Sequence, residues 1–370
     1  MTRVLVDGVI YGEQQWGGIG RCFSETLSRI GNKDGSVEII LHLPANCRAT
    51  IPKGQHIRGI RDFNIRPRTL FHPLVTRVSK ARARTLRPQI FHSTYYAPPY
   101  WSGLRTVVTV HDFIYEKYPS LLGDARRFIE QKRRVIEQAD AMVAVSHSTK
   151  EDILEYTKAD EAKIEVIYHG VSDGFLGSSP SGLDSSKFQE KYGIADRYWL
   201  YIGKRGLYKN FGTLLRSFVR VAFQTIGHLV AVGGEAQLEP WQVDILVRNR
   251  LEQRVHLLST IDDETLRIAY SGSVALVFPS LSEGFGIPLL EAMASGTPII
   301  ASDIPVFREI AADAALYFDP YDEESLAEAM TQVLDQTTTQ SLVEKGRKRV
   351  RAFSWDTASR KLENVYKRLA

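Results

Sequence analysis

Residues 283–303 read EGFGIPLLEAMASGTPIIASD, and this stretch is the strongest indicator of the fold. It begins with Glu283 and a glycine–aromatic–glycine turn, whose glycines allow backbone conformations closed to other residues. Pro288 suits the first turn of a helix, where its missing N–H costs nothing, and Gly296 is placed to end that helix. A β-branched run follows at once and predicts a buried strand. The stretch therefore predicts a loop, a short helix over 289–294 and a strand.

Two carboxylates of this stretch, Glu283 and Glu291, are eight residues apart. We expect Glu283 to lie in the mouth of a cleft and Glu291 about one turn into the helix. The N–H groups at a helix start form a ready anion site. Carboxylates for hydroxyls beside amides for phosphate are the groups needed to hold a sugar nucleotide. The alternative interpretation is an ordinary amphipathic helix after a tight turn.

The spacing of the two glutamates encloses Gly284-Phe285-Gly286 and Pro288 and is followed by GTPIIASD. Together these residues resemble the hallmark of retaining glycosyltransferases of family 4, the glycosyltransferase group 1 domain, which have the GT-B fold. The resemblance implies an α/β protein with two Rossmann-like doubly wound domains that face each other across a cleft. It also implies a C-terminal helix that crosses back to the N-terminal domain.

The activity that the resemblance implies is transfer of a hexosyl group from a nucleotide diphosphate sugar, UDP- or GDP-linked. The acceptor would be a glycan or a lipid-linked saccharide in polysaccharide, O-antigen or exopolysaccharide biosynthesis. The configuration at the anomeric carbon would be retained.

Length and composition agree with a protein of two soluble domains. The chain has 370 residues, of which 44% are hydrophobic and 24% are charged, so it is too long for a single core and typical of globular proteins. The two cysteines, Cys22 and Cys47, form neither a CxxC pair nor a metal-binding spacing, which favours a reducing cytoplasm. A first strand expected at 4–6 leaves no room for a signal peptide. No apolar run approaches the roughly 18 residues of a membrane span.

Alternating strands and helices predict a doubly wound parallel sheet in each half of the chain. We expect an acceptor-binding domain over residues 1–172, completed by the C-terminal helix 354–370. Residues 172–186 are rich in serine, glycine, aspartate and proline and predict a linker. Residues 187–353 would then form the domain that binds the nucleotide sugar.

A glycine-rich turn containing Gly17 and Gly18 follows the first strand and precedes a helical pattern that runs to Ile30. Such a turn is typical of an anion-binding βαβ start, although a simple helix start is equally compatible with it. The resemblance implies that both glycines pack against the donor phosphates and the acceptor. Because no GxGxxG follows a strand, a hydride-transferring Rossmann enzyme is disfavoured.

Glycosyl transfer from a sugar nucleotide leaves growing charge on the departing diphosphate, so cations or N–H dipoles must lie there. The loop 203–210, GKRGLYKN, contains Lys204, Arg205 and Lys209. It resembles the family's Gly-x5-Lys-Asn segment, which implies Lys209 and Arg205 as catalytic cations. Whether Lys204 or Arg205 contacts the phosphate stays open, and a solvated pair of surface cations is the alternative.

The resemblance assigns Glu283, as a catalytic residue, to the hydroxyls of the donor sugar and Glu291 to those of the ribose. A carboxylate suits both tasks, because charged hydrogen bonds are the stronger kind. Backbone N–H groups from Gly286 to Leu290 would contact the diphosphate or the sugar. The remaining donor-binding positions are Gly284, Phe285, Gly286, Ile287, Leu289 and Leu290.

His111 follows an apolar strand expected at 106–110, and ligands of open α/β sheets lie beyond the carboxyl ends of strands. The resemblance implies that this histidine approaches the reacting sugar and the acceptor as a catalytic residue. Asp112 would orient its ring or cap the next helix. Three further histidines lie at strand ends, where we expect mainly structural roles: His92, His147 and His169.

The sequence contains no DxD triplet and no His, Cys or Asp set with metal-ligand spacing. We therefore expect a metal-independent reaction without a cofactor, in which the nucleotide sugar is a substrate. Lys209, Arg205 and helix dipoles would take the place of a divalent ion.

Residues 58–87 are strongly basic, with nine cations against the single acid Asp62. A segment of this kind can contact an anionic membrane face or a lipid diphosphate, and a solvated helix face is equally compatible. No series of stacking aromatics runs through it, which disfavours nucleic acid as a partner. We expect a cytoplasmic protein that can make peripheral contact with the inner membrane face.

Two alternative functions stay open, a sugar-nucleotide 2-epimerase of the same fold and a non-catalytic subunit that binds nucleotide sugars. The pair Glu283 and Glu291 disfavours the epimerase. The presence of Lys209 and His111 together with both glutamates argues against a decayed, non-catalytic site.

Overall fold

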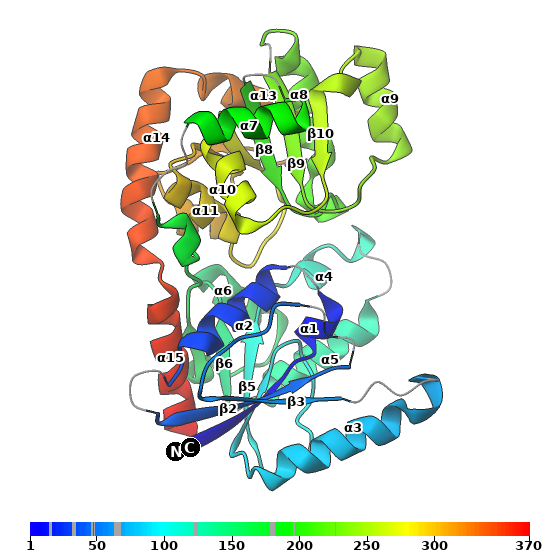
Figure 1. Ribbon diagram of the computed structural model, residues 1–370, viewed down its shortest axis with the longest axis vertical. Helices are drawn as coiled ribbons and strands as arrows, with labels where there is room; N and C mark the ends of the chain where they lie inside the picture. The colour runs from blue at the N-terminus through cyan, green and yellow to red at the C-terminus, as the bar shows by residue number, and fades with distance from the viewer. Residues whose placement is uncertain are drawn as a thin grey trace. The chain divides into compact units, whose positions relative to one another are not determined.

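Figure 1 shows the computed structural model of the chain. It describes residues 1–14, 17–31, 35–45, 47, 49–62, 68–121, 125–177, 182–194, 197–225 and 227–370. The chain divides into two compact units. Unit 1 comprises Met1–Glu116, Asp124–Gly170 and Ser354–Ala370, and unit 2 comprises Lys117–Gly123 and Val171–Phe353. Unit 2 is thus inserted into the chain of unit 1.

In its described part, unit 1 contains a seven-stranded parallel sheet with the order β3-β2-β1-β4-β5-β6-β7. Its strands are β1 (Thr2–Asp7), β2 (Val37–Leu43), β3 (Ile57–Arg61), β4 (Ile90–Ser93), β5 (Arg105–Val110), β6 (Ala141–Ala144) and β7 (Ile164–Val166). The central strands are apolar on both faces because helices cover the sheet from both sides. The strand order reverses between β1 and β4, and such a switch point is where ligands bind in open α/β sheets.

The helices of unit 1 are α1 (Ile10–Glu13), α2 (Gly18–Arg29), α3 (Arg68–Thr85), α4 (Ile114–Lys117), α5 (Arg126–Glu137), α6 (His147–Tyr156) and α15 (Trp355–Leu369). Short 3-10 turns lie at η1 (Pro119–Leu121, in unit 2) and η2 (Glu161–Lys163). The C-terminal helix α15 packs against α2, and Leu362 and Tyr366 join Phe23 and Leu27 of α2 in one core. The predicted return of the C-terminal helix to the N-terminal domain is therefore confirmed.

The chain passes very close to itself where α15 begins. A Cβ atom on Gly170 would lie only 2.2 Å from the backbone nitrogen of Trp355. No side chain can be accommodated at that distance without moving the backbone, so glycine is required by close approach. Gly170, where the chain leaves unit 1, and Ser354, where it returns, are therefore neighbours within unit 1.

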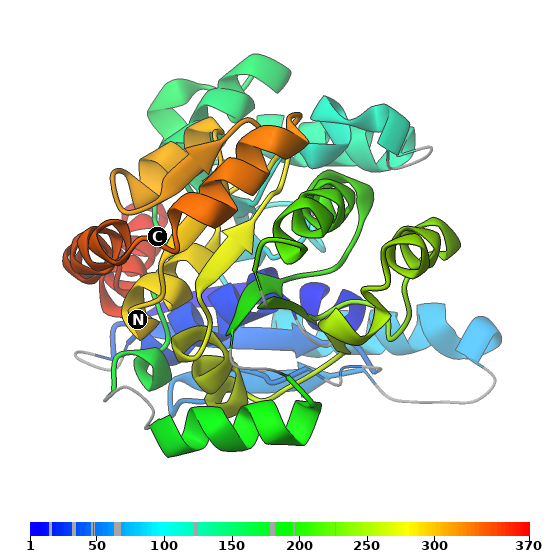
Figure 2. The ribbon, with the colours of Figure 1, turned by 90° about the horizontal axis from the view of Figure 1, so that it is seen from above.

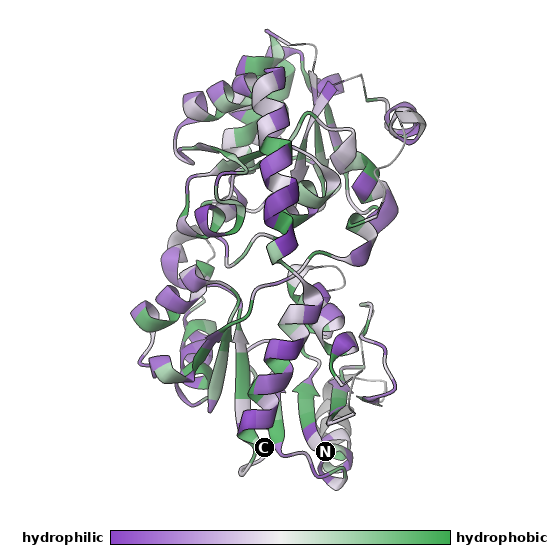
Figure 3. Cartoon of the chain, turned by 90° about the vertical axis from the view of Figure 1, so that its left-hand side faces the viewer, coloured by the Kyte–Doolittle hydropathy of each residue, from purple (hydrophilic) through white to green (hydrophobic). Residues whose placement is uncertain are grey.

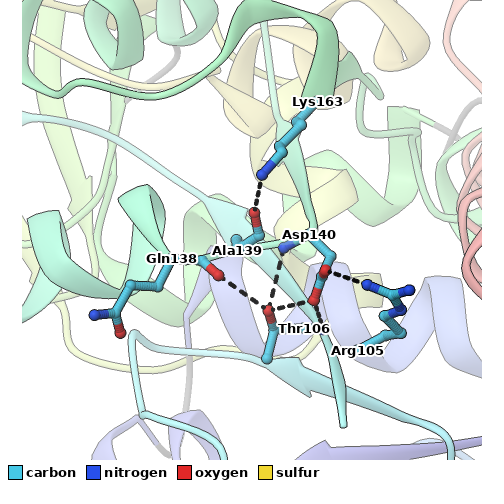
Figure 4. Close-up of polar contacts among 6 residues, drawn as sticks. All are labelled: Arg105, Thr106, Gln138, Ala139, Asp140 and Lys163. Carbon is cyan, nitrogen blue, oxygen red and sulfur yellow. Dashed lines mark hydrogen bonds and ion pairs between the residues drawn. The ribbon is translucent and has the colours of Figure 1, made fainter. Parts of the chain in front are cut away.

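Asp140 fastens the amino-terminal ends of β5 and β6 (Figure 4). Its carboxylate accepts hydrogen bonds from the backbone N–H of Thr106 at 2.8 Å and from the guanidinium of Arg105 at 3.0 Å. The hydroxyl of Thr106 lies 3.0 Å from the same carboxylate. These contacts fix the register of two strands, and His111 follows the opposite, carboxyl end of one of them, β5.

In its described part, unit 2 contains a six-stranded parallel sheet with the order β10-β9-β8-β11-β12-β13. Its strands are β8 (Arg197–Ile202), β9 (Gly227–Val232), β10 (Val255–Leu258), β11 (Ala275–Phe278), β12 (Ile299–Ser302) and β13 (Leu316–Phe318). Its helices are α7 (Gly182–Tyr192), α8 (Phe211–Ala222), α9 (Pro240–Asn249), α10 (Asp263–Ser271), α11 (Ile287–Ser295), α12 (Pro305–Ala311), α13 (Glu323–Gln332) and α14 (Gln336–Arg349), with 3-10 turns η3 (Asp173–Phe175), η4 (Leu207–Lys209), η5 (Glu252–Arg254) and η6 (Val350–Ala352). The switch point of this sheet lies between β8 and β11.

Strand β8 shows how the sheet of unit 2 is covered on both faces. Successive side chains of a strand point to opposite faces. Trp199 and Tyr201 join the core formed with α8 and α13, whereas the hydroxyl of Tyr198 donates a hydrogen bond to the carbonyl of Ala269 in α10 at 2.8 Å. Figures 1 and 2 show the pair α8 and α13 on one face and the pair α7 and α10 on the other. Two doubly wound sheets of this kind confirm the predicted fold class.

Hydropathy follows the same plan in each unit. Figure 3 shows the strands mostly in the colour of hydrophobic residues, whereas α14 and α15 are largely hydrophilic on the side turned to the viewer. Among the described helices, none combines the length and the apolar composition that a bilayer crossing requires.

The segment 172–186 differs from the linker that its composition predicts. It contains η3, whose Phe175 is buried with its ring 5.9 Å from that of Tyr270, and it contains the start of α7 at Gly182. Asp173 and Gly174 therefore belong to a turn and Gly182 to a helix start, whereas residues 178–181 of the predicted linker lie outside the described residues.

The basic segment 58–87 forms β3 and α3, joined by residues outside the described part. Arg66 lies among those residues, and the side chain of Arg68 is not described either. Three of the other cations have protein partners. Arg58 pairs with Glu38 at 3.1 Å, Lys80 lies 4.3 Å from the ring centre of Tyr100, and Arg84 lies 5.8 Å from that of Trp101. Arg61, Arg77, Arg82 and Arg87 are exposed.

Candidate active site

The loops that follow β8 and β11 meet at the switch point of unit 2 and bring together Lys209 and Glu283. The Nζ atom of Lys209 lies 2.5 Å from Oε1 of Glu283. Both side chains are largely withdrawn from solvent, with 15% and 13% of their surfaces exposed. Two residues far apart in the sequence, each expected in the site, therefore form one ion pair.

The carboxylate of Glu283 is held from one side. The hydroxyl of Ser280 donates a hydrogen bond to the same atom, Oε1, at 2.7 Å. The backbone N–H of Leu281 donates to the carbonyl of Tyr208 at 2.8 Å, which ties the two loops together. Within the described chain, both side-chain partners of Glu283 meet Oε1, so Oε2 can accept a hydrogen bond from a ligand hydroxyl.

The helix α11 begins two residues earlier than predicted, at Ile287. Gly286 precedes it with a φ of +109°, a conformation that side chains other than glycine rarely adopt. Gly296 ends the helix at φ +69°, as predicted. Pro288 has no N–H, and the N–H of Leu289 already donates to the carbonyl of Gly286 at 3.0 Å. Within the expected range Gly286 to Leu290, neither Pro288 nor Leu289 therefore offers an anion a free backbone N–H.

Glu291 lies on α11 and is 4% exposed. The buried hydroxyl of Tyr270, on α10, donates a hydrogen bond to its Oε2 at 2.9 Å. Burying a carboxylate is costly unless hydrogen bonds compensate. The tyrosine therefore both stabilises this acid and fixes its orientation.

Three of the expected donor-binding side chains belong to the core of unit 2. Leu289 and Leu290 are fully buried, and Phe285 packs edge-on against Phe353 with ring centres 6.0 Å apart. Gly284 is buried as well, whereas Ile287 is partly exposed. A ligand would meet Phe285, Leu289 and Leu290 through backbone atoms alone.

The two cations that precede Lys209 have different surroundings. The guanidinium of Arg205 donates hydrogen bonds to backbone carbonyls of the loop after β9: to Gly233 at 2.8 Å, to Gln237 at 3.3 Å and to Glu235. Lys204 is exposed. Arg205 thus holds two loops together in this structure, and a role at the phosphate stays a prediction for both residues.

His111, in unit 1, is buried at the carboxyl end of β5. Its backbone N–H donates to the hydroxyl of Tyr96 at 3.1 Å, and its Nε2 lies 3.3 Å from the carbonyl oxygen of Thr94. Burial lowers the pKa of His111 to about 4, against the opposing attraction of Asp112. The ring is therefore neutral near pH 7, with its proton on Nε2 and an acceptor at Nδ1.

The other strand-end histidines differ in their surroundings. His92 is fully buried and shares hydrogen bonds with the hydroxyls of Tyr366 at 2.5 Å and Thr109 at 2.9 Å. His169 is buried with its ring 5.4 Å from that of Trp355. His147 is exposed at the start of α6.

Gly17 immediately precedes α2, and Gly18 is the first residue of that helix. A Cβ atom on Gly17 would lie 2.1 Å from Oε1 of Gln14. A side chain at this position would have to displace only the flexible end of the Gln14 side chain, so close approach alone does not require glycine here. Contact of either glycine with donor phosphates stays a prediction.

The chain matches two protein-family models. Residues 16–175 match the family model described as Glycosyltransferase Family 4, and residues 184–349 match the model described as Glycosyl transferases group 1. The chain belongs to glycosyltransferase family 4. Membership of this family confirms the resemblance inferred from Glu283 and Glu291.

Individual family 4 relatives are moderately similar in sequence. The O-antigen chain mannosyltransferase RfbU of Salmonella typhimurium is 31% identical over 226 residues, which are 61% of this chain and 60% of that protein. The O-antigen chain mannosyltransferase B of Escherichia coli is 26% identical over 295 residues, 77% of this chain and 76% of that protein. The aligned region thus spans between about three fifths and three quarters of these relatives.

Solved structures support the GT-B fold over the whole chain. Sucrose-phosphate synthase from Thermosynechococcus elongatus superposes with a TM-score of 0.77, covering 100% of this chain and 99% of that one at 20% identity. HepE from Anabaena, in complex with UDP and glucose, gives a TM-score of 0.76, covering 99% of both chains at 16% identity. At these identities the likeness establishes the fold alone.

Sequence reasoning missed several side chains that support the family 4 site. Ser280 and Tyr270 each bind one of the two glutamates, and Tyr96 holds the backbone of His111. Ser280 lies three residues before Glu283, so it could have been suggested by proximity. Tyr270 and Tyr96 carry no local signal, because their roles depend on contacts between separate elements.

Proposed function

We propose that this family 4 protein is a retaining, metal-independent hexosyltransferase that uses a UDP- or GDP-sugar. Its acceptor would be a glycan or lipid-linked saccharide in polysaccharide or O-antigen biosynthesis. The relatives named as O-antigen mannosyltransferases support this class and make mannose the first candidate sugar. HepE, described in complex with UDP and glucose, supports keeping UDP-sugars as candidates.

The observation that carries the proposal is the ion pair of Lys209 and Glu283 at the switch point of unit 2. Without a ligand the two charges neutralise each other. A bound nucleotide sugar would offer each a new partner, the diphosphate for Lys209 and a sugar hydroxyl for Glu283. The ammonium would then lie where charge grows on the leaving group, which is the placement that accelerates the transfer.

The other donor contacts would come from α11. Glu291, oriented by Tyr270, would accept hydrogen bonds from the ribose hydroxyls. The first N–H groups of α11 would face the phosphates or the sugar. Because a positive side chain and backbone dipoles supply the phosphate contacts, we expect equal activity in EDTA and in magnesium or manganese.

In unit 1, His111 is proposed to act on the reacting sugar or the acceptor. With its pKa lowered to about 4 by burial, the ring is a weak base near pH 7. It would therefore orient a hydroxyl through Nδ1 rather than remove its proton. The leaving phosphate would help to deprotonate the acceptor, and this front-side departure would retain the anomeric configuration.

A donor panel tests the proposed function. UDP-, GDP- and ADP-sugars are incubated with the protein and an acceptor mixture, and nucleotide release and thermal shift are recorded, since a ligand that binds the folded state raises its stability. We expect one base to be preferred and Glu291→Gln to weaken binding of that nucleotide about 10- to 100-fold. Tight binding without release of any nucleotide would favour the non-catalytic subunit, and conversion of the nucleotide sugar into its 2-epimer would favour the epimerase.

We also propose that the exposed cations Arg61, Arg77 and Arg82 contact an anionic acceptor surface at the inner face of the membrane. Each basic residue near such a surface contributes about 1 kcal/mol. Replacing all three with glutamine should therefore lower the affinity for vesicles with anionic lipids at least 10-fold, measured by co-sedimentation at low salt. Equal sedimentation of parent and variant, or binding to neutral vesicles alone, would contradict this proposal.

A further inference from the structure

We propose that Lys132 is a positioning residue for His111, an inference that rests on the proposed role of His111 in the transfer. Lys132 lies on α5 and is 1% exposed. Its Nζ donates a hydrogen bond to the carbonyl oxygen of Asp112 at 2.5 Å. That carbonyl belongs to the residue that directly follows His111, so the ammonium is anchored to the backbone next to the proposed reacting histidine.

The ammonium of Lys132 is buried and meets further partners in the same turn. Besides Asp112 it meets Oε1 of Glu116 at 2.9 Å and Oε2 at 3.0 Å. It also lies 3.8 Å from the ring centre of Phe113. All these partners lie in the segment 112–116 that leads from β5 into α4. One side chain from α5 therefore clamps the whole turn that carries His111.

A buried ion pair of this kind is not explained by stability alone. Replacing a buried pair with apolar residues of similar size is often neutral or stabilising, whereas removing a single partner is strongly destabilising. What the pair supplies in this place is geometry. An ammonium has three donors, and here they join one backbone carbonyl to one carboxylate.

The residue before Lys132 holds the opposite side of His111. The side-chain amide of Gln131 donates to the carbonyl of Tyr96 at 2.9 Å, and the hydroxyl of Tyr96 accepts the backbone N–H of His111. Tyr96 has a φ of +57°, a conformation that costs energy for a large side chain and persists only where its surroundings impose it. Consecutive residues of α5 thus fix His111 from both directions.

Lys132 also acts on the charge of His111. Burial is the main cause of the low pKa of His111, and the positive charge of Lys132 lowers the pKa further, whereas Asp112 raises it. His92 and His169 are the other titratable groups that interact electrostatically with His111. Removing the charge of Lys132 should therefore raise the pKa of His111, a change that a merely structural role would not predict.

The test compares Lys132→Met/Glu116→Gln, which removes the ammonium without leaving a buried carboxylate, with Arg133→Met. Arg133 is the next residue of α5 and is exposed, so its variant loses the same charge without touching the turn. For the double variant we expect kcat to fall about 10- to 100-fold, since small misplacements of reacting groups have effects of this size. The KM for the nucleotide sugar should stay within about twofold, and Arg133→Met should match the parent.

The titration of His111 is followed by NMR in the same proteins, with His111→Ala used to assign its signal. We expect an upward shift of its pKa in the double variant. An unchanged kcat with an unchanged titration would overturn the proposal for Lys132. Full activity of His111→Ala would instead overturn the role of His111, and the titration would still report on Lys132. If the double variant does not fold, Lys132→Gln/Glu116→Gln keeps an amide donor at position 132 and is judged by the same two measurements.

Discussion

Replacing Lys209 with methionine is expected to lower kcat about 100- to 1000-fold, the loss typical when one group that stabilises developing negative charge is removed. In the structure Lys209 is the cation that meets Glu283 directly. Methionine keeps the length of the side chain and removes its charge. Affinity for the nucleotide should fall as well, because the diphosphate already carries charge before the reaction.

The comparison for this variant needs two further proteins. Lys209→Met leaves Glu283 largely buried without its partner, which can destabilise a fold by about 3–5 kcal/mol. Lys209→Met/Glu283→Gln removes both charges and separates a loss of catalysis from a loss of folded protein. Lys187→Met, an exposed lysine of α7 in the same unit, should retain the rate of the parent. A kcat for Lys209→Met within about threefold of the parent, in folded protein, would refute the proposed role.

The second large effect concerns pH and stability. Burial lowers the pKa of His92 and His169 to about 3 and that of His111 to about 4, from an ordinary value of 6.5. Below pH 6.5 these three histidines therefore become protonated in the unfolded chain but stay neutral in folded unit 1. This contribution to stability is complete above pH 6.5 and is lost as the pH falls towards 3 to 4.

The free energy of unfolding falls by about 1.4 kcal/mol per pH unit for each extra proton that the unfolded chain binds. Between pH 7 and pH 5 each histidine contributes about 2 kcal/mol, so the free energy of unfolding of unit 1 should fall by about 6 kcal/mol. Asp7 opposes the trend, because burial raises its pKa, but it is one group against three. The effect is a large fraction of the usual stability of a domain.

Native-state hydrogen exchange of the β4 and β5 amides, corrected for the intrinsic effect of pH, measures this loss within unit 1. His92→Gln and His169→Gln should each reduce the pH dependence by about a third. A stability of unit 1 that stays constant from pH 7 to pH 5, or variants with the slope of the parent, would show that these histidines are not kept neutral by the fold.

The sequence predicted best those features that local backbone chemistry determines. Pro288 and Gly296 mark the start and end of α11 because one lacks an N–H and the other adopts a positive φ. Long apolar runs marked the central strands in the same way. The short edge strands β3 and β13 were not predicted, because β3 has no apolar run and β13 is only three residues long.

What the sequence could not predict depends on pairs of distant residues. Lys132 is one of several cations in a basic helix, and nothing nearby distinguishes it from its exposed neighbour Arg133. Tyr270 gains its role from a glutamate on another helix. Arg205 looked like a phosphate ligand because of its loop, and the carbonyls that bind it come from the loop after β9.

The insertion of unit 2 into unit 1 also determines the order in which the parts of unit 1 are synthesised on the ribosome. His92 of β4 is synthesised early, but its partner Tyr366 emerges more than 270 positions later, after every residue of unit 2. Until then the apolar faces of α2, β1 and β2 lack the helix that covers them. The nascent N-terminal part is therefore an unfinished domain for most of translation, at risk of aggregation, while the inserted part can already reach its native state.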